Sequence, residues 1–420
     1  MVSEAFDAAR ARATGRAGLL GMLLIAYSFN FVDRQIVGIL AGPIKAELGL
    51  SDTQLGLLGG LAFALFYTGL GIPIALLADR RGRSGVIAVS LALWSGFTAL
   101  CGAAANFTQL FLCRMGVGIG EAGGVAPSYA LIADSFPAAQ RARALAIFSL
   151  GIPLGSAAGV LFGGLVAANV GWRTAFVAVG LAGLAFAPLF RWLVRDPPRA
   201  SDAPAAPPVR EVARTLASKP SFWLLAFGAA SSSMLGYGVA FWLPQLLQRS
   251  FGLGLIETSQ YYGAILLIGG VAGVLLGGWL GDRAGARNKA GYARLPAIAF
   301  VLAVPLYAGA IYSGSATIAF PLFVLCQALA YIWLGPVIAA VQHLVPQPMR
   351  ATASAVFLFV NNLIGIGAGT LVMGALSDAL TPRLGDEALR VSMLISLSFY
   401  LLAAALMWAG SRRLARDWHH

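Results

Sequence analysis

Charged residues are scarce in this chain of 420 residues: they make up 11% of it, against about a quarter of an average soluble domain. This scarcity excludes an ordinary soluble enzyme. Cysteine is also rare, and Cys101, Cys113 and Cys326 lie in apolar stretches without the spacing of a metal site or a disulfide framework. The sequence has no Walker A motif, which argues against transport driven by ATP. We therefore expect no enzymatic activity, no metal and no cofactor.

Hydrophobic residues, by contrast, make up 59% of the chain, and they gather in twelve runs long enough to cross a bilayer as helices of about 20 residues. The runs cover roughly residues 17–42, 54–78, 84–105, 108–132, 142–168, 172–194, 221–247, 258–281, 294–313, 316–342, 351–380 and 391–410. We expect the first run to be an uncleaved span. The pattern predicts an all-α integral membrane protein.

A break in the pattern separates the sixth run from the seventh. Residues 195–219 contain five prolines and several charges and cannot span a membrane. The sequence therefore predicts two six-helix halves, 1–194 and 220–420, joined by a cytoplasmic linker. Within the linker, residues 209–216 are expected to form a short amphipathic helix on the membrane surface.

The basic residues are distributed unevenly between the two sides of the predicted membrane protein. With the N-terminus inside, 22 of the 29 fall in inner loops and tails and 5 in outer loops. This bias predicts that both termini are cytoplasmic, and it explains the net charge of +12 without nucleic acid as a partner. The excess of arginine over lysine and the compact loops fit a bacterial inner membrane protein.

An internal repeat supports the division into halves. Asp79 begins a D-R-x-G motif after the second apolar run, and Asp282 begins the same motif after the eighth. A weaker echo relates Arg141 to Arg350, 209 residues further along the chain. Parallel duplication of a multi-helix half is typical of secondary transporters.

These motifs carry a family resemblance. The D-R-x-G loops after the second and eighth of twelve spans resemble the signature of the major facilitator superfamily, and this resemblance covers the whole chain. In the first half, residues 30–34 (NFVDR), the glycine-rich run 114–122 with Pro127, and residues 133–136 (ADSF) resemble the spinster-like branch. That resemblance implies secondary transport of lysolipids or sphingoid phosphates, such as sphingosine 1-phosphate, with proton coupling.

The resemblance also implies a gate at the cytoplasmic side. The two motif aspartates are expected to accept hydrogen bonds from the start of a helix in the opposite half when the cavity opens outward. The candidate gating residues are Asp79, Arg83, Arg141, Asp282, Arg287 and Arg350. The alternative is that the arginines only mark cytoplasmic loops.

Four charged residues fall well inside spans: Asp33, Arg34, Arg114 and Glu121. Each costs about 2.5–3.5 kcal/mol at a helix centre, and their charges cancel, so a paired cluster facing a cavity lowers the cost. Burial and a nearby guanidinium act in opposite directions on the protonation of a carboxylate, and opening to one side of the membrane changes both. This behaviour suits a proton carrier.

From this chemistry we predict roles for the cluster. Asp33 and Glu121 are assigned to proton coupling. Because arginine stays protonated and binds phosphate or carboxylate bidentately, Arg34 is assigned to the substrate head group, together with Asn30. Arg114 is expected to pair with Glu121 and to contribute to binding. The alternative is a static salt-bridge network that joins the first and fourth spans.

The second half offers polar and aromatic side chains but no charge between its span ends. We predict that substrate contacts there come from Tyr237, Gln327, Tyr331, Asn361 and Asn362. A cavity that is charged on one side and apolar on the other suits an amphiphile with a head group and a chain.

The sequence thus predicts a monomeric, proton-coupled transporter of an amphiphilic anion, a lysophospholipid or a lipid like sphingosine 1-phosphate, that works by alternating access among membrane lipids. Alternatives are a proton-coupled carrier of small organic anions and a multidrug efflux carrier. A membrane-embedded enzyme or a lipid scramblase is less favoured, because no nucleophile, base and orienting group cluster at one depth.

Overall fold

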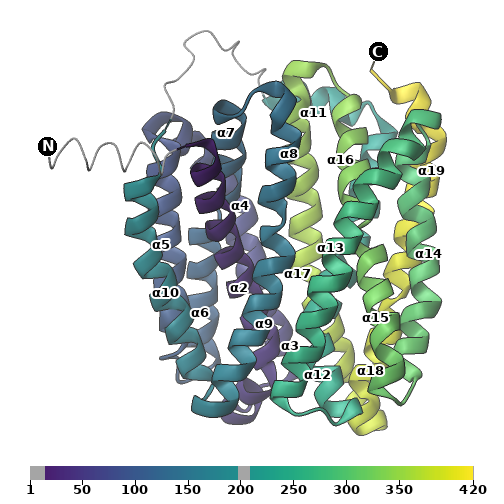
Figure 1. The fold of residues 1–420 in the computed structure, drawn as a ribbon. Coiled ribbons are helices and arrows are strands. Elements are labelled where there is room, and N and C mark those ends of the chain that lie inside the picture. Colours follow the sequence, from purple (N-terminus) through teal and green to yellow (C-terminus); the bar gives the residue numbers. More distant parts are fainter. Residues whose placement is uncertain (1–14, 197–208, 420) are drawn as a thin grey trace, which may run out of the picture. The chain divides into compact units, whose positions relative to one another are not determined.

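The structure is a computed structural model that describes residues 15–196 and 209–419 (Figure 1). The described residues form helices joined by short connections, with no strand among them. Arg10, Arg12 and the proline-rich part of the predicted linker, 197–208, lie outside the described residues.

All six apolar runs of the first half are helical. The second, fourth and fifth runs are each divided into two helices. The helices are α2 (Arg16–Leu48), α3 (Asp52–Gly59), α4 (Leu61–Arg81), α5 (Arg83–Cys101), α6 (Phe107–Glu121), α7 (Val125–Ser135), α8 (Ala138–Ser149), α9 (Gly151–Val170) and α10 (Trp172–Leu193).

The six runs of the second half are helical as well. The helices are α11 (Val209–Ala217), α12 (Pro220–Phe251), α13 (Leu255–Arg287), α14 (Gly291–Tyr312), α15 (Ala316–Tyr331), α16 (Leu334–His343), α17 (Arg350–Leu384), α18 (Ala388–Ser396) and α19 (Ser398–Asp417). Two short 3₁₀ turns, η1 (Gln347–Met349) and η2 (Gly385–Glu387), precede α17 and α18.

Ten segments of the described chain are long and apolar enough to cross a membrane. One of them, Gln347–Asp417, has 71 residues and contains the last two predicted runs, α17 and α18 with α19. The predicted fourth run is not among the ten, because α6 ends at Glu121 and the chain turns before α7 begins at Val125. The predicted all-α membrane fold is confirmed.

The contacts divide the chain into two compact units. Among the described residues, the first unit comprises 15–50 with 62–196, and the second comprises 51–61 with 209–419. This division differs from a simple cut of the sequence in one place. The helix α3 belongs to the first half by sequence, but its contacts place it in the second unit, on α17.

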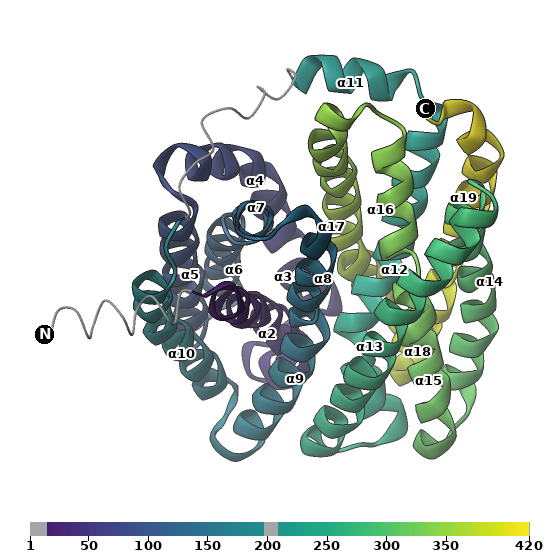
Figure 2. The same cartoon turned by 45° about the horizontal axis from the view of Figure 1, so that its top comes forward.

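Within the first unit, α2 packs along α9 and α10 packs along α5 (Figure 2). Glycines on α9 allow its backbone to approach that of α2 closely. A Cβ on Gly155 would lie 2.3 Å from the carbonyl oxygen of Ser28, and one on Gly159 would lie 2.8 Å from the backbone of Val32. The substrate candidates of α2 are therefore held on a helix with a tightly fixed position in this unit.

Within the second unit, α12 packs on α17 and α19, and α14 packs on α15 and α19. The predicted helix at 209–216 forms as α11. Its apolar residues Val212 and Leu216 are fully buried, and α11 contacts α12 and α17, so protein covers this side of the helix.

Candidate functional site

The glycines of α6 set the position of the first-half charges. A Cβ on Gly118 would lie 2.6 Å from the carbonyl oxygen of Phe63 on α4, and one on Gly120 would lie 2.5 Å from the backbone nitrogen of Trp94 on α5. Real Cβ atoms do not approach backbone so closely, so glycine is required at both places. The glycine-rich run thus lets α6 press against α4 and α5 and carries Glu121 into the interior of the first unit.

The structure brings the four predicted charges together in this unit. Glu121 is fully buried, Asp33 and Arg114 are each 1% exposed, and the side chain of Arg34 is 12% exposed. The Arg34 Nε donates a hydrogen bond of 2.9 Å to Oε2 of Glu121. The partly solvent-exposed guanidinium of Arg34 therefore pairs with the fully buried carboxylate of Glu121.

The predicted pairing of Arg114 with Glu121 is corrected by this geometry. The ion pair of Glu121 is made by Arg34 of α2, and the described contacts include none between Glu121 and Arg114, although Arg114 lies within electrostatic range of Glu121. Arg114 instead donates from Nη1 to the backbone carbonyl of Asp33 at 3.4 Å. It ties α6 to α2 beside the Arg34–Glu121 pair.

Three aromatic rings surround the guanidinium of Arg34. Its Cζ lies 5.1 Å from the ring centre of Phe31, 4.7 Å from that of Phe63 and 4.6 Å from that of Tyr67. Cation–π contacts of this kind stabilise a cation away from water. Sequence reasoning did not identify Phe63 and Tyr67, although their spacing of one helical turn on α4 stacks the two rings at 5.0 Å.

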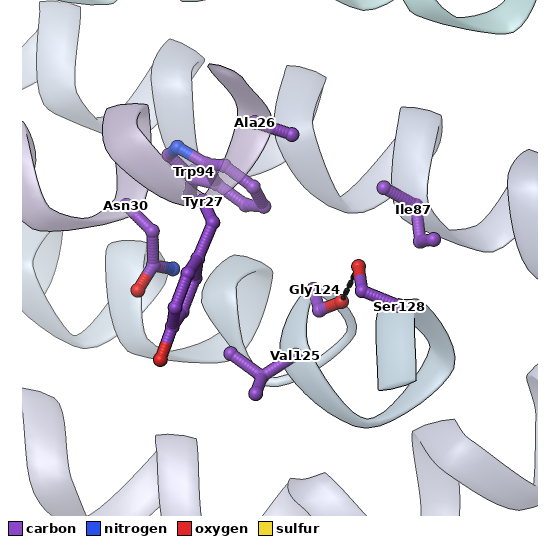
Figure 3. A pocket seen from close by; sticks show the side chains of 8 residues that line it. All are labelled: Ala26, Tyr27, Asn30, Ile87, Trp94, Gly124, Val125 and Ser128. Atoms are coloured by element: carbon purple, nitrogen blue, oxygen red, sulfur yellow. Dashed lines mark hydrogen bonds between the residues drawn. The ribbon is translucent and has the colours of Figure 1, made fainter. Parts of the chain in front are cut away.

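Several buried polar atoms beside this pair make no hydrogen bond within the described chain. They include Oε1 of Glu121 and Oδ1 of Asp33. The Asn30 side chain lies within hydrogen-bonding reach of Glu121. Asn30 also lines a cavity of about 10 Å³, together with Tyr27, Trp94 and Ser128 (Figure 3). A cavity of this size has room for about one water molecule. The site therefore offers polar groups that can accept a proton or a bound polar group.

The predicted gating residues of the first half form a local network. Arg83 donates from Nε to Oδ1 of Asp79 at 3.0 Å and also pairs with Asp134. Arg141 donates to the backbone carbonyl of Phe136 at 3.0 Å. The Arg83 bonds join the ends of α4, α5 and α7 within the first unit, and the Arg141 bond joins α8 to the end of α7.

Sequence reasoning missed Asp196 at the same end of the unit. Its carboxylate accepts a hydrogen bond of 2.9 Å from the backbone N–H of Ser84 and one of 3.0 Å from the Ser84 hydroxyl. It thereby caps the start of α5. Its place directly before the proline-rich segment gave it the appearance of a linker residue.

The matching residues of the second half are arranged differently. Asp282 and Arg287 are exposed, and neither makes a side-chain hydrogen bond to another described residue. The helix α13 continues through the D-R-x-G motif to Arg287, whereas α4 ends at Arg81. Arg350 begins α17, and its Nε has no hydrogen-bond partner in the described chain. The repeat in sequence is thus not a repeat in local geometry.

The five predicted contact residues of the second half fall into two groups. Tyr331 lies within hydrogen-bonding reach of Gln327 and within electrostatic range of Tyr237. On α17, Asn361 is buried, accepts a hydrogen bond of 2.8 Å from the Ser233 hydroxyl and donates to the Asn362 side chain at 3.2 Å. The second unit therefore presents amide and phenol groups without a charge.

A further ionic cluster, which sequence reasoning missed, lies at the start of α3. Arg249 binds both carboxylate oxygens of the buried Asp52, at 2.8 and 2.9 Å. The Ser377 hydroxyl donates to the same carboxylate at 2.7 Å. These bonds fix α3 to α12 and α17.

Asp378 completes this cluster as a helix cap. It accepts hydrogen bonds from the backbone N–H groups of Asp52 at 3.0 Å and of Thr53 at 2.7 Å. A carboxylate at a helix N-terminus is stabilised by the unpaired N–H groups and by the helix dipole. Asp378 thus fixes the start of α3 to α17 within the second unit.

With this geometry in view, the comparison with known proteins decides the family. The sequence profile of the Major Facilitator Superfamily matches residues 23–370. The chain belongs to this superfamily. It is therefore a transporter and not an enzyme.

Three relatives show which branches of the superfamily the chain is similar to. It is 37% identical over 403 residues to an MFS-type efflux pump of Mycolicibacterium smegmatis. The aligned region covers 95% of this chain and 93% of the relative. It is 27% identical over 372 residues to the hexuronate transporter of Bacillus subtilis, covering 85% and 86% of the two chains. The crystal structure of a bacterial homologue of the human lysosomal transporter spinster matches with a TM-score of 0.87 and 32% identity, over 96% of this chain and 98% of that one. The predicted spinster-like resemblance is confirmed.

The close approach of α6 gives a first prediction for this transporter. We expect Gly120→Ala to lower the free energy of unfolding by about 1–3 kcal/mol, because the added methyl group meets the backbone of Trp94. Thermal unfolding of the purified protein in detergent measures the effect. Gly21→Ala on α2 is the control, since a Cβ there meets nothing within 4 Å. Equal melting temperatures for the two variants would contradict the packing argument.

The ionic cluster on α3 gives a second prediction. Arg249→Ala leaves the Asp52 carboxylate buried without its guanidinium, which costs roughly 3 kcal/mol. We expect the amides of residues 52–59 to exchange with solvent about a hundredfold faster, as measured by hydrogen exchange and mass spectrometry. The double variant Asp52→Asn with Arg249→Gln should exchange more slowly than Arg249→Ala. Unchanged exchange in Arg249→Ala would show that the ion pair does not hold α3.

Proposed function

We propose that this transporter moves an amphiphilic anion of the lysophospholipid or sphingoid-phosphate type, together with a proton, by alternating access. The observation that carries the proposal is the pair of Arg34 and Glu121. The guanidinium is partly accessible and the carboxylate is fully buried, so an incoming anion reaches the arginine first. The aromatic rings around Arg34 suit the entry of a ligand with an apolar part.

The pair couples an anion to a proton by competition. A phosphate or carboxylate that binds Arg34 bidentately displaces Glu121 from it. A buried carboxylate without its counter-charge is costly, and protonation removes the charge. The occupied site then holds one anion and one proton more than the empty site, and its net charge is unchanged. Anion and proton therefore travel in the same direction.

Asp33 and Asn30 support this exchange. Asp33 lies in the same charge cluster and has an unbonded carboxylate oxygen, so it is the second proton-coupling residue. Asn30 faces the small cavity beside Trp94 and Ser128, and it provides a polar step between Glu121 and water in that cavity (Figure 3). Tyr237, Gln327, Tyr331, Asn361 and Asn362 are the proposed contacts of the second unit with the substrate.

Location and orientation complete the proposal. The distribution of basic residues supports a bacterial inner membrane protein with both termini in the cytoplasm. We propose that the chain acts as a monomer. Gating at the cytoplasmic side is assigned to the network of Asp79, Arg83 and Arg141 and to its sequence counterparts Asp282, Arg287 and Arg350.

Two other substrate classes have support of their own. The similarity to a hexuronate transporter favours small organic anions, which Arg34 would hold in the same way. The similarity to an efflux pump favours drug export. Both anion classes would bind at the Arg34–Glu121 pair and differ in what surrounds the bound anion, whereas a cationic drug would not bind Arg34.

Proton flux into liposomes tests the proposal and separates the classes. Purified protein is reconstituted with a pH-sensitive dye inside, and lysolipids, sphingoid phosphates, small organic acids or cationic drugs are added across an imposed pH gradient. We expect a proton signal with the amphiphilic anions alone. A signal with organic acids or with drugs alone would replace the substrate class, and lipid movement without any proton signal would replace the coupled carrier by a scramblase. Glu121→Gln liposomes are the control.

A further inference from the structure

An apolar groove lies between α14 and α19 of the second unit, which run side by side in both views (Figures 1 and 2). It has a volume of about 580 Å³. Small, buried alanines such as Ala297 and Ala404 form its floor. Large residues that are about half exposed form its sides: Ile298, Val301, Leu302 and Leu401. The groove is an open furrow on the surface of the unit and is separate from the charge cluster of the first unit.

One end of the groove carries two cations. Arg412 lines the groove directly, and the Cζ of Arg294 lies 5.5 Å from the ring centre of Trp408, another lining residue. Both arginines are exposed, and in the described chain neither forms an ion pair with a carboxylate. The start of α14 and the end of α19 thus place two uncompensated guanidinium groups beside an aromatic ring.

The length of the groove matches one leaflet of a bilayer. From Leu401 to Arg412 the helix α19 rises about 16 Å, roughly half of a hydrocarbon core of about 30 Å. Tryptophan is typical of the head-group level, and arginines there attract anionic lipid. Alanines below the ring leave room for a chain that branched residues would exclude.

We propose that this groove binds one anionic phospholipid, with an acyl chain along the alanine floor and the phosphate on Arg294 and Arg412. Two guanidinium groups favour a head group with a net negative charge over a zwitterionic one, because the ammonium of the latter is repelled. The bound lipid is a component of the surrounding leaflet and not the transported substrate. It stabilises the packing of α14 against α19.

Native mass spectrometry of the detergent-purified protein tests this proposal. Phosphatidylglycerol or phosphatidylethanolamine is titrated into the delipidated protein, and bound lipid is counted. We expect phosphatidylglycerol to bind preferentially, and the double variant R294A/R412A to lose roughly tenfold in its affinity. The matched control is R413A/R416A, which removes two exposed arginines from the same helix end that do not line the groove. This control should bind as the unchanged protein does.

A second variant keeps the proposal open to refutation if the arginine variants fold poorly. A405F fills the groove from an exposed position while both arginines stay in place. We expect it to lose phosphatidylglycerol binding as well. Equal binding of the two lipids, or full binding by either R294A/R412A or A405F, would overturn the proposal. A dimer that is present in the unchanged protein and lost in A405F would assign the groove to a second copy of the chain. That result would overturn the proposal too.

Discussion

Glu121→Gln is expected to abolish accumulation of substrate driven by a pH gradient. With a difference of about two pH units and one proton per substrate, the unchanged transporter can accumulate its anion up to about 100-fold, and the variant should reach no more than equilibration. Glutamine has the shape of glutamate but carries no proton. Radiolabelled uptake into liposomes with and without the gradient measures the difference.

The same variant should still bind and exchange substrate. Because the neutral amide no longer competes for Arg34, the anion binds with equal or higher affinity, and counterflow between equal pH values continues. Asp33→Asn is expected to weaken accumulation less, since Asp33 makes no direct pair with Arg34 in the described contacts. Glu387→Gln, at an exposed glutamate that pairs with Arg390, is the control and should be neutral. Full accumulation by Glu121→Gln and by Asp33→Asn would remove the mechanism.

Arg34→Ala is expected to weaken substrate binding strongly. Loss of a charge-assisted contact of this kind costs about 2–5 kcal/mol, a factor of roughly 30 to several thousand in the dissociation constant. The substitution also leaves Glu121 buried without its counter-charge, which costs about 3–5 kcal/mol of stability when the carboxylate is ionised. Tryptophan fluorescence titration and thermal unfolding measure the two effects separately.

A double variant separates binding from stability. In Arg34→Ala with Glu121→Gln, the buried Glu121 charge is removed together with its partner, so the melting temperature should recover while binding stays weak. Arg34→Lys keeps the charge but not the bidentate geometry and should bind with intermediate affinity. Binding by Arg34→Ala at the level of the unchanged protein would exclude Arg34 as the head-group site.

The membrane made much of the fold predictable. Backbone groups in lipid must be satisfied within a helix, so twelve apolar runs translate directly into helices. The cost of a charge in lipid pointed to Asp33, Arg34, Arg114 and Glu121 before any contact was known. The partner of Glu121 was not predictable in this way, because Arg34 and Glu121 lie 87 residues apart on different helices and meet only through the packing of the first unit.

Residues at the ends of spans were harder to recognise. Asp52, Asp378 and Asp196 lie where a carboxylate is expected merely from contact with water, and nothing in their local sequence distinguishes a helix cap from a loop residue. The D-R-x-G repeat, by contrast, suggested a similarity of local structure that the two halves do not have. Two similar loops differ in structure because α13 continues through the motif and α4 does not.

Proton uptake on substrate binding tests the central claim most directly. Isothermal titration calorimetry of the purified protein, repeated in buffers that differ in ionisation enthalpy, gives the number of protons bound with each anion from the slope of the observed heat. Competition at the Arg34–Glu121 pair predicts an uptake that approaches one proton for the unchanged transporter and none for Glu121→Gln. Zero uptake in the unchanged protein, or the same uptake in both, would contradict the account.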